Sequence, residues 1–153
     1  MNDYLSAPCF LIRTGDQKWA IAATVQCLGD DIQIALFGGE KPHIGATALA
    51  IPRPGINDPK KVSSTASVLC KTGHKDDELA REAALRIAAC RNATVCVTVG
   101  IHVDNATSDD IDKLYANFSD AVDRITGLLD EKSMTLIQKA VWTNYGSPQS
   151  APL

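Results

Sequence analysis

Alternating apolar and polar positions dominate the first half of the chain and predict short strands joined by tight turns. Residues 18–28 alternate without a break, which is the pattern of a half-buried antiparallel strand. Shorter runs of the same kind occur at 32–37 and 43–52. A strand at 9–13 precedes them, and a strand rich in Ser and Thr at 62–71 follows them. Because the turns between the first four runs are too short for a crossover helix, the pattern predicts a mostly antiparallel sheet.

The apolar period lengthens to that of a helix in the second half of the chain. Residues 76–91 carry small apolar side chains at helical spacing, with acidic residues in the first turn, and Asn92 ends this predicted helix. A strand is predicted at 94–103. Thr107-Ser-Asp-Asp110 is a variant capping box that begins a long amphipathic helix. The expected buried stripe of this helix comprises Ile111, Leu114, Tyr115, Phe118, Val122, Ile125, Leu128 and Leu129.

The order of strands, helix, strand and helix predicts an α+β fold. We expect a two-layer sandwich, in which a mostly antiparallel sheet of about six strands carries two helices on one face. The expected organisation is a lead-in at 1–8, a single α+β domain at 9–131, a C-terminal helical extension at 132–146 and a flexible tail at 147–153. The second face of the sheet is then open to water, a ligand or a second copy of the chain.

Composition narrows the classes of partner. The 153 residues include 15 basic and 18 acidic side chains, and the absence of a Lys/Arg block argues against nucleic acid and anionic membranes. No apolar run approaches the length of a membrane-spanning helix. The five cysteines form no CxxC pair, which favours reduced, buried thiols over a disulfide framework or a zinc ribbon. We therefore expect a cytoplasmic protein.

A Gly-Gly turn with polar neighbours stands between two of the alternating runs. We interpret the stretch from Phe37 to Ala50 as a hairpin that carries the functional site. Gly38 and Gly39 allow a positive φ or a close backbone approach, and Pro42 presets its own φ. An ordinary solvated loop is an equal alternative, because Gly-Gly with Pro is common turn chemistry.

All three histidines, His43, His74 and His102, occur at the ends of predicted elements, each with a glycine within two residues. Taken singly, each is typical of a turn residue or a helix cap. If the strand order brings them together, one edge of the sheet would carry three imidazoles beside Lys75 and the N-terminus of a helix.

Two kinds of site fit such an edge. In the first, Gly73, His74 and Lys75, with Lys41 and the free N–H groups of the helix, bind a phosphate or another anion. In the second, the three imidazoles hold zinc with one coordination position open. A conventional hydrolase, kinase or dehydrogenase is disfavoured, since the chain has no Gly-x-Ser-x-Gly elbow, Walker loop or dinucleotide fingerprint.

Three blocks of the sequence resemble a known family. Gly38-Gly-Glu-Lys-Pro-His-Ile-Gly-Ala, Thr72-Gly-His-Lys-Asp-Asp-Glu-Leu-Ala-Arg and Val99-Gly-Ile-His-Val-Asp are similar to signature blocks of the small D-subunit-type proteins associated with gallate decarboxylase. These proteins are prenylated-flavin chaperone-like and similar in fold to proteasome assembly chaperones. The resemblance covers roughly residues 9–129, and the segment after Leu129 looks like an extension beyond the family's core.

The resemblance implies an accessory protein rather than an enzyme. Such a protein would help a UbiD-type decarboxylase acquire or keep prenylated FMN, so the implied partners are the decarboxylase catalytic subunit and a flavin phosphate, FMN or its prenylated form. Carried over residue by residue, the cofactor site would comprise Gly38, Gly39, His43, Gly45, Gly73, His74, Lys75 and His102.

Two alternatives from other classes stay open. One is a small metal-dependent enzyme that uses zinc bound by His43, His74 and His102. The other is a structural domain that forms a homo-oligomer through its open sheet face or through a helix at 133–142.

Overall fold

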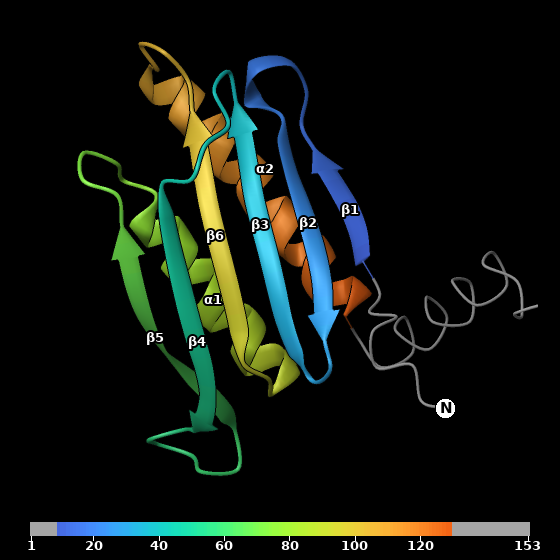
Figure 1. Cartoon of the computed structure of the whole chain (residues 1–153). Helices are drawn as coiled ribbons and strands as arrows, with labels where there is room; N and C mark the ends of the chain where they lie inside the picture. The colour runs from blue at the N-terminus through green and yellow to red at the C-terminus, as the bar shows by residue number, and fades with distance from the viewer. Residues whose placement is uncertain (1–8, 130–153) are drawn as a thin grey trace, which may run out of the picture.

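The computed structural model describes residues 9–129, which form one sheet and two α-helices (Figure 1). The predicted helical extension and tail lie outside the described residues. In chain order the elements are β1 (Cys9–Thr14), the 3-10 helix η1 (Gln17–Trp19), β2 (Ile21–Leu28), β3 (Asp31–Gly39), β4 (Ala46–Pro54), β5 (Val62–Cys70), α1 (Asp77–Arg91), β6 (Val95–His102) and α2 (Ser108–Leu128).

The six strands lie in the order β1-β2-β3-β6-β4-β5, and all neighbours are antiparallel except β3 and β6. The predicted α+β sandwich is therefore confirmed, but the predicted hairpin between residues 37 and 50 is wrong. β6 lies between β3 and β4, so Gly39 faces His102 while Ala46 faces Val99. The reason is that β6 buries β-branched side chains along one face and occupies the centre of the sheet.

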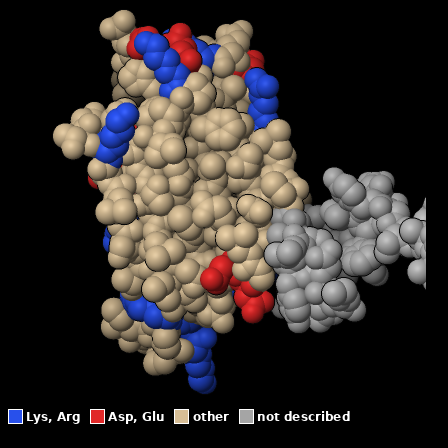
Figure 2. Space-filling view, in the orientation of Figure 1, with Lys and Arg blue, Asp and Glu red and all other residues tan. Residues whose placement is uncertain are grey.

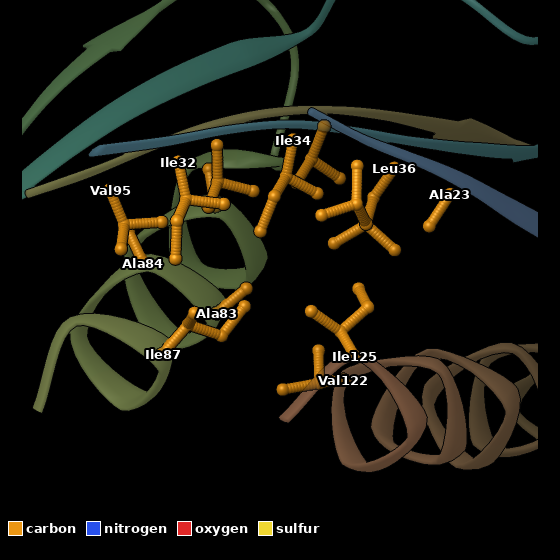
Figure 3. Close-up of a cluster of buried hydrophobic side chains, with 14 of the residues drawn as sticks. Ala23, Ile32, Ile34, Leu36, Ala83, Ala84, Ile87, Val95, Val122 and Ile125 are labelled. Atoms are coloured by element: carbon orange, nitrogen blue, oxygen red, sulfur yellow. The ribbon is translucent and has the colours of Figure 1, made fainter. Parts of the chain in front are cut away.

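Both helices lie behind the sheet in Figure 1 and bury one of its faces. Figure 3 shows Ile32, Ile34 and Leu36 of β3 directed from the sheet towards the two helices. α1 contributes mainly alanines to this core, and small side chains allow the helix to lie close to the strands. The fully buried residues of α1 are Ala80, Ala83, Ala84, Ile87 and Ala88.

The predicted buried stripe of α2 is only partly correct. Phe118, Val122, Ile125 and Leu129 are buried, whereas Ile111 and Tyr115 are about half exposed and Leu128 lies at the margin of exposure. The first turns of α2 pack beside η1, where the polar side chain of Asp110 makes the contact instead of an apolar one. The apolar stripe consequently begins later in the helix than its sequence period indicates.

The opposite face of the sheet has few charged side chains. Figure 2 shows this face in the orientation of Figure 1, with Lys, Arg, Asp and Glu gathered at its margins. The exposed large apolar residues of the strands on this face are Leu11, Leu28, Leu49, Ile51 and Leu69.

Two further expectations concern membranes and thiols. None of the helices in residues 9–129 is long and apolar enough to cross a membrane. All five cysteines are free thiols, but only Cys27 is buried, while Cys9, Cys70 and Cys90 are exposed. The expectation of buried thiols is therefore wrong for these three residues, because each occupies a strand edge or a helix face away from the core.

Candidate functional site

Three segments meet at one edge of the sheet, which we call the histidine edge: residues 40–45 between β3 and β4, residues 71–76 between β5 and α1, and residues 102–104 at the end of β6. The strand directions explain the meeting. β3 and β6 are parallel and end together, β4 begins there, and β5 ends beside the start of β4. All three histidines consequently lie at this edge, which is the upper end of the sheet in Figure 1.

The backbone of the histidine edge is closely packed. Gly39 has φ +75° and lies against the backbone of His102, whose carbonyl oxygen accepts the N–H of Glu40 at 2.7 Å. A Cβ on Gly100 would overlap the carbonyl oxygen of His43, and a Cβ on Gly45 would overlap the carboxylate of Asp76. Only glycine at these positions allows the connections to approach one another.

His43, His74 and Asp76 form one cluster. The Nε2 atom of His43 lies 2.8 Å from Nδ1 of His74 and 3.3 Å from Oδ2 of Asp76. Nδ1 of His74 lies 3.7 Å from the same carboxylate oxygen. The two imidazole side chains are 19% and 27% exposed, and the carboxylate side chain is 7% exposed. These three atoms are within 4.8 Å of one another and could hold a metal ion.

Hydrogen bonds to the backbone position two of these side chains. Nδ1 of His43 lies 3.0 Å from the carbonyl oxygen of Lys41, and since a carbonyl can only accept, Nδ1 carries the hydrogen in this bond. Oδ1 of Asp76 accepts the N–H of Ile101 at 3.0 Å. The second atom of each group, Nε2 and Oδ2, therefore faces the cluster.

His102 belongs to a second, more exposed group. Its Nε2 lies 3.0 Å from Oδ1 of Asp104, whose other oxygen forms an ion pair with Lys41. Glu40 accepts the backbone N–H of Asp104 at 3.0 Å. Lys41 first, and His102 second, hold the pKa of the Asp104 carboxyl below its usual range. The centroid of the His102 ring is 6.2 Å from that of the His43 ring, so His102 lies outside the cluster of His43, His74 and Asp76.

The remaining candidate residues, Gly38, Gly73 and Lys75, lie outside the cluster of His43, His74 and Asp76. Gly38 packs against the backbone of Ala20, which ends η1, and of Ile21, which begins β2. Gly73 has φ +85° with open space around its Cα atom, and Lys75 is exposed in the same connection. Both residues are therefore accessible to a ligand from solvent.

Sequence reasoning missed Asp76 as a site residue. Its position before a helix led us to interpret it as a carboxylate favoured by the helix dipole. The local signal was its spacing of two residues from His74, which is too common to indicate a metal ligand. The partner that completes the cluster, His43, is distant in sequence and is brought near only by the strand order.

Comparisons with known proteins agree with the fold and with the three sequence blocks. A family described as the prenylated flavin chaperone LpdD-like domain matches residues 15–130. Among solved structures, a yeast chaperone complex for 20S proteasome assembly matches with a TM-score of 0.50 and 16% identity. The match covers 82% of this chain and 98% of that chain, and at this identity it supports the fold alone. A search of the curated proteins finds no match.

Proposed function

Because the chain belongs to the prenylated flavin chaperone LpdD-like family, we propose that it is a non-catalytic accessory protein that binds prenylated FMN or FMN and supports a UbiD-type decarboxylase. The family match over residues 15–130 is the observation that carries this proposal. The same family supports a chaperone role with a partner protein, for which the catalytic subunit of the decarboxylase is our candidate.

The histidine edge has groups that fit the phosphate of such a cofactor. Lys75 supplies an exposed cation, His74 a partly exposed imidazole, and Gly73 an accessible backbone. Asp77 and Glu78 in the first turn of α1 disfavour an anion directly over the helix N-terminus. We therefore place the phosphate over the connection at residues 73–75, with the glycines at 38, 39 and 45 and the imidazoles of His43 and His102 completing the proposed site.

The open face of the sheet is the proposed surface for protein contacts. Its apolar side chains include Leu11 and Leu69, which are 68% and 82% exposed. Charged residues are confined to its margins (Figure 2). A surface of this kind is typical of interaction sites, so we propose that the decarboxylase subunit or a second copy of the chain docks there.

Thermal unfolding of the metal-stripped full-length protein, with and without FMN or prenylated FMN, tests the cofactor proposal. A ligand at 100 times its Kd stabilises the folded state by about 2.7 kcal/mol, so the midpoint should rise by several degrees. Lys75→Ala should reduce this rise and leave the midpoint without ligand unchanged. Lys60→Ala is the matched control, because Lys60 is exposed in the β4–β5 connection at the opposite end of the sheet.

The proposal fails if neither flavin raises the midpoint of the wild type, or if Lys60→Ala reduces the rise as much as Lys75→Ala does. Substituting His74 by Ala adds a second check. It should abolish ligand stabilisation and barely change the midpoint without ligand, since the ring is partly exposed and lies outside the core.

A further inference from the structure

We propose that Nε2 of His43, Nδ1 of His74 and Oδ2 of Asp76 bind a zinc ion, with a further coordination position open to solvent. This ligand set differs from the three histidines considered from the sequence, since Asp76 takes the place of His102. The metal site does not rest on the proposed function, because its geometry and its test involve the metal alone.

The positions of the three atoms match those of zinc ligands. Their separations of 2.8, 3.3 and 3.7 Å define a triangle whose circumscribed circle has a radius of about 1.9 Å. A point about 0.7 Å above this triangle lies about 2.0 Å from every atom, which is the length of zinc bonds to imidazole nitrogen and carboxylate oxygen. Ligands at the corners of a tetrahedron around zinc are separated by about 3.3 Å, close to the mean of the three separations.

The electron pairs of the cluster also favour a cation at its centre. Since Nδ1 of His43 donates to the carbonyl of Lys41, the Nε2 atom of the neutral ring carries a lone pair. This lone pair lies 3.3 Å from Oδ2 of Asp76, which is itself an acceptor. Without a metal, a hydrogen on Nδ1 of His74 satisfies Nε2 at 2.8 Å and leaves Oδ2 at 3.7 Å. A divalent ion in place of that hydrogen would satisfy all three atoms.

The outer contacts of the cluster are those expected around a metal site. The carbonyl of Lys41 orients the ring of His43, and the N–H of Ile101 orients the carboxylate of Asp76. Such contacts fix the ligand geometry and strengthen metal binding. The absence of a side chain at Gly45 leaves room for the carboxylate, and at Gly100 it leaves room for the backbone of His43. The site is therefore held before any ion binds.

The choice of ion follows from the donor atoms. Two imidazole nitrogens disfavour magnesium and calcium, which prefer oxygen ligands. Three protein ligands with a near-tetrahedral spacing favour zinc with one remaining position. That position faces solvent, because His43 and His74 are 19% and 27% exposed at the surface of the edge.

Zinc titration of the metal-stripped full-length protein by calorimetry tests the site, with cobalt absorption as a second measurement. We expect one ion per chain in the wild type and a cobalt spectrum of tetrahedral type. Asp76→Asn should weaken zinc binding by about 100-fold or more. The asparagine carbonyl can still accept the N–H of Ile101, so the fold should be retained. His102→Ala is the matched control, a histidine of the same edge that should leave zinc affinity within about twofold of the wild type.

Three results would overturn the metal site: no zinc binding by the wild type, unchanged affinity in Asp76→Asn, or equal loss in His102→Ala. His74→Ala keeps the test decisive if Asp76→Asn fails to fold, since its ring is partly exposed and lies against His43 and Asp76. Zinc binding without any flavin-dependent rise in midpoint would support the metal site and contradict the cofactor proposal. A flavin-dependent rise in midpoint without zinc binding would support the cofactor proposal and contradict the metal site.

Discussion

Two buried aspartates, Asp76 and Asp110, occupy similar places in the fold but have opposite surroundings. Each has 5% of its surface exposed, and each lies at the start of a helix that packs on the sheet. The difference between them is the number of donors that the chain itself supplies to each carboxylate.

Asp110 is fully satisfied by neighbouring groups. One oxygen is 2.8 Å from both the ammonium of Lys18 and the indole N–H of Trp19, which donates to it. The other accepts the backbone N–H and the hydroxyl of Thr107 at 3.0 Å, completing the capping box. Lys18 first, then the Thr107 N–H and the Trp19 indole, hold the pKa of this carboxyl well below its usual range. This aspartate is a structural residue.

Asp76 receives a single backbone N–H at one oxygen, and the groups that face its other oxygen among the described residues are two imidazole nitrogens. A buried carboxylate that lacks firm partners is unfavourable unless a ligand completes its surroundings. The donors around a buried acid, rather than its burial, therefore separate a structural role from a binding role.

The largest effect that we predict is on stability, at Asp110. Asp110→Ala removes the acceptor shared by Trp19, Lys18 and Thr107 and abolishes the capping box of α2. The thermal midpoint should fall by about 10 °C, with or without zinc. Circular dichroism during heating measures it. A midpoint within about 2 °C of the wild type would contradict the structural role.

A smaller effect on stability and a complete effect on the metal are predicted for Gly45→Ala. The added methyl group overlaps the Asp76 carboxylate and should displace it, at a cost of about 1 kcal/mol, with loss of zinc binding. Gly127→Ala is the control, because an added Cβ at this position in α2 would meet no atom within 4 Å, and alanine favours a helix. Zinc binding by Gly45→Ala with wild-type affinity in calorimetry would contradict the role of Asp76 as a ligand.

Acid should reveal the depressed pKa of Asp110. A carboxyl whose pKa is lower in the folded state stabilises the fold above its ordinary pKa of about 3.9, and this contribution is lost as the pH falls below that value. The stability difference between the wild type and Asp110→Asn should therefore shrink as the pH falls from about 5 towards 2. Urea unfolding at a series of pH values measures it, and a constant difference would argue against the ion pair with Lys18.

The smallest effect is predicted for His102→Ala. Its ring is about half exposed and its pairing with Asp104 is at the surface, where such pairs contribute little. The free energy of unfolding should change by less than about 0.5 kcal/mol. Urea unfolding checks this value, and a loss above about 1 kcal/mol would mean that His102 supports the backbone of Gly39 more strongly than its contacts indicate.

Much of the fold could be predicted from local patterns. The alternation at 18–28, the capping box at Thr107 and the helix end at Asn92 each depend on neighbours within a few residues. The structure contains the capping box and the helix end, but the strand begins only at Ile21, because residues 17–19 form η1. The buried stripe of α2 was predicted less well, since its first turns depend on what packs against them. The sequence indicated histidines and a lysine as candidate site residues, but it did not indicate Asp76.

Most of the helices and strands follow from local patterns, because side-chain period, caps and turns act over a few residues. The place of β6 between β3 and β4 depends on tertiary contacts, since strand pairing joins segments that are distant along the chain. With β6 in this position, His43 lies against His74, and the backbone N–H of Ile101 donates to Asp76. The grouping of His43, His74 and Asp76, and hence the candidate zinc site, follows from strand order and not from any local pattern.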